Sequence, residues 1–180
     1  MPQSLSNVLI HIVFSTKSRE RFIHPAIETE LHRYMAGTLR ALESPALSIN
    51  GTEDHVHILC ALSRRTAISD LVEEVKKSSS KWMKTKGSEY RRFFWQTGYG
   101  AFSIGESNRD ACLRYIARQK RRHKKQSFQD EYREILRTSH SMNGMFGIRP
   151  ITLFQSSADQ RPFSQGRCPW LSHSTPLGSL

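Results

Sequence analysis

The chain has 180 residues, with 27 Lys and Arg against 16 Asp and Glu, 37% hydrophobic residues and a formal net charge of +11. This length fits one domain, no apolar run is long enough to span a membrane, and three widely spaced cysteines fit neither a disulfide framework nor a CxxC zinc site. Without a leader segment we expect a cytoplasmic protein, and a pI near 10 predicts a polyanionic partner.

The first half of the chain alternates between strand and helix patterns. Residues 7–16 form a β-branched apolar run that is typical of a buried strand, and a helical pattern begins at Pro25. Residues 46–51 and 55–61 indicate two strands joined by a short turn, and residues 67–84 indicate an amphipathic helix.

The second half adds one strand and further helices. Residues 93–104 predict a fourth strand, with a bend or bulge at Gly98 and Gly100. Residues 106–125 predict a third helix, and residues 127–137 a fourth. The order β-α-β-β-α-β predicts an α+β, ferredoxin-like fold: a four-stranded antiparallel sheet with two helices on one face and added C-terminal helices.

The most distinctive motif is a pair of histidines in the third predicted strand. His55 and His57 are two residues apart, so both imidazoles face one side of the sheet while Val56 faces the other. Two imidazoles on one surface suit a divalent metal, although an isolated pair is more often a polar pair without one. Asp54 precedes the pair and either orients the His55 ring or serves as a turn residue.

A tyrosine and a glutamine follow in the third predicted helix. Tyr115 and Gln119 are four residues apart and therefore lie on one face of that helix. A phenol can attack a phosphodiester that a metal polarises, and an amide oxygen can complete the metal's shell; alternatively, Tyr115 is a packing residue. The remaining histidines of the first 137 residues lack an HxH partner and are interpreted as structural or surface residues: His11, His24, His32 and His123.

A basic run surrounds this tyrosine. Residues 114–125 contain seven Lys and Arg and no acid, which indicates dense phosphate contacts or, alternatively, a solvated face. Aromatic residues could add base stacking, although each is more often part of a core. The candidate DNA-binding residues are Arg114, Arg118, Lys120, Arg121, Arg122, Lys76, Lys77, Trp95 and Tyr99.

These segments together resemble the HUH-class single-tyrosine transposases, the IS200-like enzymes of insertion sequences that move as single-stranded DNA. The matching segments are HIVFSTKSR, DHVHIL, WQTGYGAFSI and RYIARQKRRHKKQSFQDEYREIL, in family order over about residues 7–137. The resemblance implies that His55 and His57 are metal ligands, that Gln119 is the third ligand, and that Tyr115 is the nucleophile.

The resemblance also implies the reaction and the partners. It implies Mg²⁺ or Mn²⁺, a 5′-phosphotyrosine intermediate, single-stranded DNA hairpins as substrate and a homodimer that can share active sites between subunits. It further implies a bacterial or archaeal, nucleoid-associated protein. No nucleotide cofactor is expected, because a covalent intermediate conserves the phosphodiester energy and the chain lacks a GxxxxGK[ST] loop.

Two other functions are compatible with parts of this pattern. One is a domesticated enzyme that cuts hairpin repeats. The other is a non-catalytic module that binds single-stranded nucleic acid, because the same sheet topology serves RNA-binding domains. The combination of His55, His57, Tyr115 and Gln119 argues against the pure binding module.

The C-terminal region departs from the family pattern. Residues 138–180 contain only three basic residues and one acid, so 24 basic and 15 acidic side chains belong to residues 1–137. The family typically ends near DERYVWD; codons for SMNGMFGIR can encode that sequence and a stop in another frame. We therefore expect a transposase domain over residues 1–137 and a disordered tail over residues 138–180 produced by a frameshift, with a lineage-specific tail as the alternative.

Overall fold

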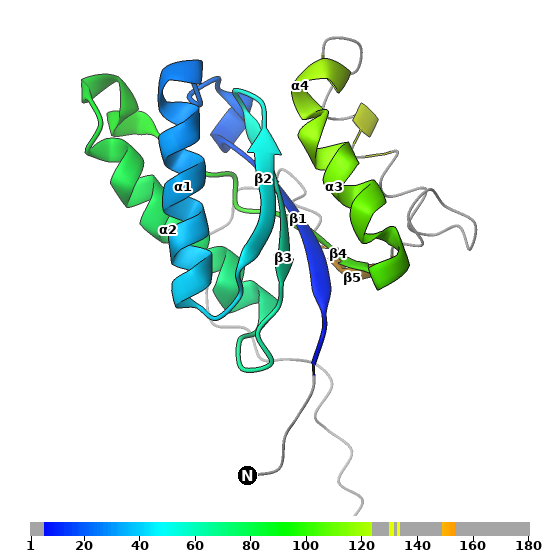
Figure 1. Cartoon of the computed structure of the whole chain (residues 1–180). Helices are drawn as coiled ribbons and strands as arrows, with labels where there is room; N and C mark the ends of the chain where they lie inside the picture. Colours follow the sequence, from blue (N-terminus) through cyan, green and yellow to red (C-terminus); the bar gives the residue numbers. More distant parts are fainter. Residues whose placement is uncertain (1–5, 124–129, 132, 134–148, 154–180) are drawn as a thin grey trace, which may run out of the picture.

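The computed structural model describes residues 6–123, 130, 131, 133 and 149–153. Its centre is an antiparallel sheet with helices on both faces (Figure 1). The strand order across the sheet is β2-β3-β1-β4-β5. The strands are β1 (Leu9–Ser15), β2 (Ala46–Gly51), β3 (His55–Ala61), β4 (Gly100–Ile104) and β5 (Arg149–Leu153).

The first four strands confirm the predicted fold class. Their spatial order is that of a ferredoxin-like sheet, with β1 and β3 at the centre. The edge strand β5 was not predicted: it pairs antiparallel with β4 and lies within the expected tail. The rest of that tail, residues 138–148 and 154–180, is outside the described residues, so the boundary at residue 137 and the frameshift stay predictions.

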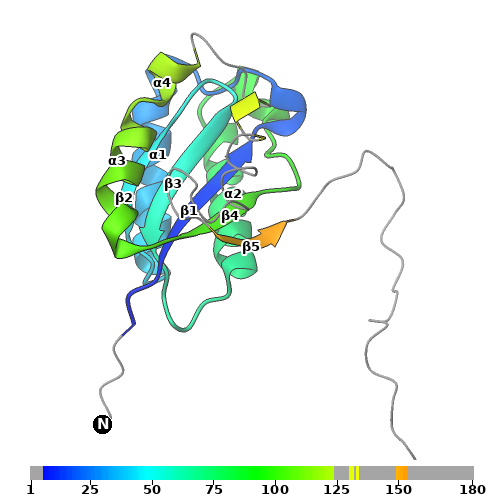
Figure 2. The ribbon, with the colours of Figure 1, turned by 90° about the vertical axis from the view of Figure 1, so that its right-hand side faces the viewer.

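The helices form one layer on each face of the sheet. Figure 1 shows α1 (Pro25–Ala41) and α2 (Ile68–Lys84) on one face, and α3 (Arg109–Ala117) and α4 (Gln119–Arg122) on the other. In Figure 2, α3 and α4 lie over the β2 and β3 side of the sheet, and β5 lies at the opposite edge. Within the described residues, no helix is long and apolar enough to cross a membrane. Three short 3-10 turns complete this part of the chain: Lys17–Arg19, Ser88–Arg92 and Glu106–Asn108.

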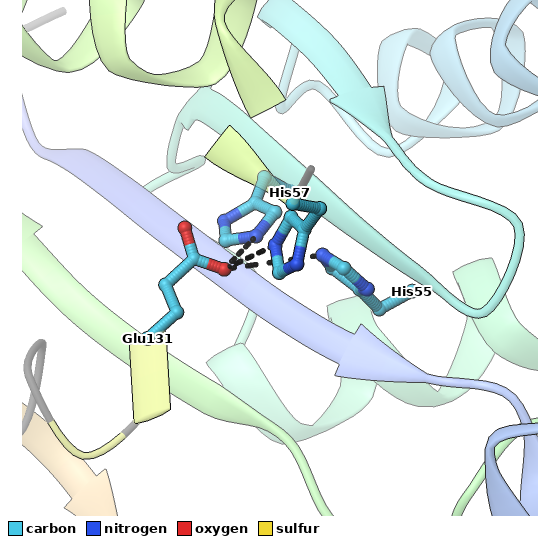
Figure 3. Close-up of side chains that lie close together, drawn as sticks. His55, His57 and Glu131 are labelled. Atoms are coloured by element: carbon cyan, nitrogen blue, oxygen red, sulfur yellow. Dashed lines mark hydrogen bonds and ion pairs between the residues drawn. The ribbon is translucent and has the colours of Figure 1, made fainter. Parts of the chain in front are cut away.

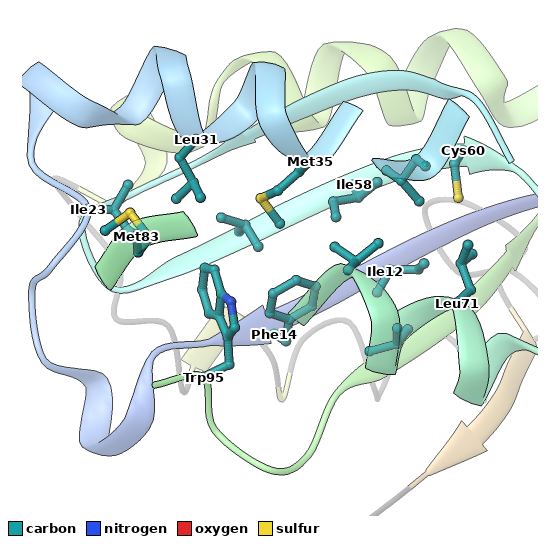
Figure 4. Packing of buried hydrophobic residues seen from close by; sticks show 14 of the residues in the cluster. Ile12, Phe14, Ile23, Leu31, Met35, Ile58, Cys60, Leu71, Met83 and Trp95 are labelled. Carbon is teal, nitrogen blue, oxygen red and sulfur yellow. The ribbon is translucent and has the colours of Figure 1, made fainter. Parts of the chain in front are cut away.

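Alternation along the central strands divides the core into two clusters. Ile12, Phe14 and Ile58 point toward α1 and α2, where they pack with residues such as Leu31 and Met35 (Figure 4). The opposite face carries a smaller apolar cluster against α3. It consists of Leu9, Val13, Leu59, Phe102, Ile104, Cys112, Tyr115 and Ile116. Because side chains alternate, the histidines of β1 and β3 belong to this second face.

The segment before β4 is irregular, which corrects the predicted strand over residues 93–104. The strand begins only at Gly100, and Trp95 forms an isolated bridge with Thr16. The Lys76 ammonium donates hydrogen bonds to the carbonyls of Gln96 and Gly98, both at 2.8 Å. This cation from α2 therefore fixes the loop in place of a strand ladder.

The third predicted helix is broken in the middle. Helix α3 ends at Ala117, Arg118 leaves the helical region with φ −96° and ψ 7°, and α4 begins at Gln119. The Asn50 side-chain amide on β2 donates to the carbonyls of Ile116 at 2.9 Å and Ala117 at 3.2 Å. A helix end leaves its last carbonyls without intrahelical partners, and Asn50 satisfies two of them here.

Candidate functional site

The two histidines of the HxH motif lie side by side on the α3 face of the sheet. His55 and His57 are fully buried. They lie on β3 and pair with Ser15 and Val13 of β1, respectively. The turn before them needs a glycine, because a Cβ atom on Gly51 would lie 2.1 Å from the His55 carbonyl oxygen. The sheet thus fixes the backbone of both histidines.

Asp54 holds the first histidine from its Nδ1 side. Its Oδ1 lies 2.7 Å from His55 Nδ1, while its Oδ2 accepts a hydrogen bond of 2.8 Å from Arg19. Burial opposes ionisation of Asp54, but the hydrogen bonds from His55, Thr52 and Arg19 prevail and lower the pKa of its carboxyl group. This arrangement supports the expected orienting role of Asp54 and turns His55 Nε2 away from it.

His11 on β1 holds the second histidine in the same manner. Its Nε2 lies 2.9 Å from His57 Nδ1, and the two rings stack with centroids 5.1 Å apart. The Tyr115 ring meets His11 edge-on at 5.9 Å. His11 is therefore part of the site, between a predicted ligand and the predicted nucleophile.

Burial favours the neutral form of these imidazoles. It lowers the pKa of His55 to about 4 and lowers the pKa of His57 and of His11 below the usual histidine range. A neutral imidazole offers a lone pair on the ring nitrogen that carries no proton. With Nδ1 engaged by Asp54 or His11, the two Nε2 atoms of the motif face the same space.

A buried carboxylate fills that space. Glu131 Oε2 lies 4.0 Å from His55 Nε2, 3.6 Å from His57 Nε2 and 2.7 Å from His123 Nε2. Figure 3 shows the side chains of His55, His57 and Glu131 pointing toward one another. Two members of this cluster were not predicted from the sequence. His123 was interpreted as a structural or surface residue, and Glu131 was not singled out. One ligand atom from each of these four residues lies within 4.8 Å of the others.

Both predicted helical residues also converge on Glu131. The Tyr115 hydroxyl donates to Glu131 Oε1, and Gln119 Nε2 donates to the same oxygen at 2.9 Å. The two residues meet here although the helix breaks between them. Burial, followed by the nearby Glu131 charge, raises the pKa of Tyr115, so this side chain is a neutral phenol.

The donor set fits a divalent cation. Three imidazole nitrogens and one carboxylate oxygen lie close together, and the Gln119 amide contacts that carboxylate group. Within the described part of the chain, His57 Nε2 and Gln119 Oε1 are buried and have no hydrogen-bond partner, which is costly unless a ligand satisfies them. Nitrogen and oxygen ligands of this kind suit first-row metals such as Mn²⁺, and the carboxylate and amide also suit Mg²⁺.

Replacing His11 should weaken metal binding without removing a ligand. A bound His57 Nε2 needs its proton on Nδ1, where it donates to His11. We expect His11→Phe to reduce Mn²⁺ affinity by about 10- to 100-fold, the usual cost of losing such a partner, and His11→Asn to restore part of it through its amide oxygen. Isothermal titration calorimetry on variants with native circular dichroism measures this. Equal affinity of wild type and His11→Phe would exclude the role.

Comparison with known proteins assigns the chain to a family. The family model described as IS200-like transposase matches residues 4–119, which include both histidines, Tyr115 and Gln119. The chain belongs to the IS200-like transposase family. No curated protein matches this transposase.

Two solved structures share the fold of this transposase. A candidate transposase from Deinococcus radiodurans R1 is 19% identical, with a TM-score of 0.52 over 66% of this chain and 98% of its own. A REP-associated tyrosine transposase bound to a REP hairpin is 14% identical, with a TM-score of 0.53 over 91% of this chain and 98% of its own. At these identities the likeness establishes a common fold.

The other described tyrosines of the transposase lie away from the histidine and glutamate cluster. Tyr34 stacks on Trp82 between α1 and α2, Tyr90 is buried in the first core cluster, and Tyr99 lies beside Lys76. Tyr132 is outside the described residues. Among the described tyrosines, Tyr115 is the one that contacts the histidine and glutamate cluster.

The predicted DNA-binding cations on α3 and α4 have different surroundings. Arg114, Arg118 and Arg121 are exposed, whereas the Lys120 ammonium pairs with Glu28 at 2.5 Å. The Arg122 guanidinium lies 4.9 Å from the centroid of the Tyr115 ring, inside the site. The basic run thus contributes cations to an exposed face and one cation, Arg122, beside Tyr115.

The predicted contacts on the other face of the sheet need one correction. Trp95 is 9% exposed and packs on Phe14 and Phe93, and its indole N–H donates to Ser79 at 2.9 Å. This placement favours a core role over the expected base stacking. Lys77 and Tyr99 keep some exposure, while the Lys76 ammonium is engaged by carbonyls, and burial lowers its pKa to about 8.

Proposed function

We propose that this chain cleaves and rejoins single-stranded DNA at hairpin-bearing element ends, with a divalent metal and a covalent bond to Tyr115. One observation carries the proposal: the Tyr115 hydroxyl and the Nε2 atoms of His55 and His57 converge on one buried carboxylate within a single chain. A binding module has no need for a phenol at such a point.

The residues of the site account for each atom of the cleavage step. The Tyr115 oxygen forms a bond to the scissile phosphorus, the bond from phosphorus to the 3′-oxygen breaks, and that oxygen leaves as a 3′-hydroxyl after taking up a proton. Glu131 already accepts the hydrogen bond of the phenol and is placed to receive its proton. Attack by a 3′-hydroxyl on the phosphotyrosine reverses the step and rejoins the strand.

A divalent cation held by His55 and His57, with Glu131, His123 or Gln119 completing its shell, would polarise the scissile phosphate. Arg122, beside the Tyr115 ring, adds positive charge where the phosphate must sit. Three imidazoles in one site favour Mn²⁺ over Mg²⁺, since Mg²⁺ prefers an all-oxygen shell.

Hairpin DNA is the substrate we propose, on two grounds. The structural relative that is 14% identical was solved with a REP hairpin, and this chain exposes Arg114, Arg118 and Arg121 beside its site. A homodimer and a cytoplasmic, nucleoid-associated location belong to the same proposal. Because one chain brings Tyr115 to its own histidines, we propose cleavage by Tyr115 of the same subunit.

A covalent trapping assay tests the function. The protein is incubated with Mn²⁺ and 5′- or 3′-labelled hairpin oligonucleotides from its own locus, and adducts are resolved by denaturing electrophoresis. We expect an adduct that retains the label on the 3′ side of the cut, disappears with EDTA, and yields a nucleotide-linked peptide containing Tyr115. Binding without an adduct on any hairpin would favour the non-catalytic module, and cutting without rejoining would favour the hairpin-repeat endonuclease.

A further inference from the structure

An exposed phenylalanine lies among lysines on the α2 side of the molecule. Phe94 is 49% exposed and, with Val8, one of the two exposed large apolar side chains in the described residues. The Lys84 ammonium lies 3.6 Å from the centroid of its ring, and the Lys17 ammonium lies 5.9 Å from it. An aromatic ring among cations is the usual platform for a base of single-stranded nucleic acid, where the ring stacks and the cations contact phosphate.

A cavity of about 450 Å³ adjoins this ring. Its size is in the range of small-ligand sites, about 300–1,000 Å³. Its walls are mostly apolar, and the exposed Lys77 adds a cation at the rim. The lining includes Val72, Lys76, Lys77, Phe94, Trp95 and Tyr99. The Lys76 ammonium binds the carbonyls of Gln96 and Gly98 and so holds the wall of the cavity in place.

The backbone connects this cavity to the histidine site. Gln96 donates its N–H to the Ser15 carbonyl, and Lys17 donates its N–H to the Phe94 carbonyl, both at 2.8 Å. On the other side of β1, Ser15 pairs with His55. The Phe94 loop and the HxH motif therefore flank the same end of β1.

We propose that Phe94 and the adjoining cavity bind one unpaired base of the single-stranded flank of the hairpin, with Lys17, Lys77 and Lys84 contacting its phosphates. The stem of the hairpin does not fit this role, because its bases already stack on their neighbours and expose only their edges. The inference rests on the proposed function for the identity of the DNA. It replaces Trp95 by its neighbour Phe94 as the stacking residue.

Fluorescence anisotropy in EDTA tests the site without cleavage. Two labelled oligonucleotides are compared: the hairpin with its single-stranded flanks and the same hairpin without them. We expect Phe94→Ala to bind the flanked hairpin about 5- to 100-fold more weakly and the flankless hairpin as wild type does, while Phe94→Tyr retains the wild-type affinity. Val8→Ala is the matched control, because it removes an exposed apolar side chain at the far end of β1.

The lysines have their own control. Lys84→Gln should weaken binding of the flanked hairpin and lower the slope of log affinity against log salt by about one. Arg65→Gln removes one positive charge after the other end of β3, where its partner is Glu43 at 3.9 Å, and should leave that slope unchanged. Equal losses for Lys84→Gln and Arg65→Gln would show that only net charge matters and would overturn the site.

A scan of abasic positions along the flank identifies the base. One abasic position should weaken binding by wild type and have no further effect in Phe94→Ala, because both changes remove the same stacking contact. Additive losses at every position, or equal losses with and without flanks, would overturn the inference. Phe94-dependent binding in a protein that never forms an adduct would reject the proposed function and keep this site; an adduct without a Phe94 effect would do the reverse.

Discussion

We expect Tyr115→Phe to abolish the covalent protein–DNA adduct and to lower strand cleavage to background. The substitution removes one oxygen atom, which is the atom that must bond to phosphorus, and leaves the ring that packs beside His11 and His57. Because no other described tyrosine contacts the cluster, no second phenol replaces it. Denaturing gels with labelled hairpin and Mn²⁺ measure the adduct directly.

The variant also needs a check on folding, because Tyr115 is a buried residue. Loss of its hydroxyl removes one of the hydrogen bonds to Glu131, worth about 1.5–3 kcal/mol when the partner is charged. Thermal unfolding followed by circular dichroism shows whether Tyr115→Phe remains folded at the assay temperature. Tyr34→Phe, between α1 and α2, is the matched control and should form the adduct at the wild-type rate. An adduct with Tyr115→Phe would place the nucleophile elsewhere.

The sequence allowed the central elements and half of the site to be predicted, because they depend on local patterns. The strand at residues 55–61 matches β3, since alternation sets which side chains share a face. The neighbours of the motif come from distant segments. His11 is 46 residues from His57, and no periodicity relates two strands that pair in the sheet. The sequence signal for His11 was a histidine inside the apolar strand that the predicted fold places beside β3.

The helix break at Arg118 and the burial of Trp95 were not predicted for a similar reason, because both depend on contacts between distant segments. The break at Arg118 depends on Asn50, which lies 66 residues before Ile116 and caps α3 from β2. The helix propensity of residues 106–125 cannot reveal that cap, because Asn50 lies outside this segment. Phe94 and Trp95 are adjacent aromatic residues, and only packing against Phe14 and Ser79 determines that Trp95 is the buried one.

A second experiment decides between Gln119, the predicted third metal ligand, and Glu131, which lies in the observed cluster. Glu131 is buried, and burial opposes its ionisation, but the hydrogen bond with His123 and the proximity of the His57 ring prevail and lower the pKa of its carboxyl group. The site therefore holds a carboxylate beside His55 and His57, whose neutral forms are favoured by burial. It is the negative charge among the four clustered residues, and a divalent cation in low-dielectric surroundings needs such a charge.

Glu131→Gln should therefore weaken Mn²⁺ binding by at least about 100-fold, more than the loss of a hydrogen-bond partner such as His11. The amide keeps the volume of the side chain but removes the charge. It also replaces one of the two acceptor oxygens, which face Tyr115 and His123, by a donor. His57→Ala should have an equal or larger effect, whereas Gln119→Ala should cost less, since its amide carries no charge. Calorimetric titration of the three variants with Mn²⁺, on protein with native circular dichroism, ranks them.

The ranking separates two architectures of the same site. If Glu131→Gln loses more Mn²⁺ affinity than Gln119→Ala does, the carboxylate is a ligand. Tyr115 would then lose its hydrogen-bond acceptor when the ion binds, and its phenol would lie next to the polarised phosphate. If Gln119→Ala loses more Mn²⁺ affinity, Gln119 completes the coordination shell of the metal, as the family resemblance implies. Glu131 then keeps its contact with Tyr115 and accepts the proton of the phenol. In the second case Glu131→Gln should slow adduct formation at saturating Mn²⁺ while the metal affinity stays within about threefold of wild type.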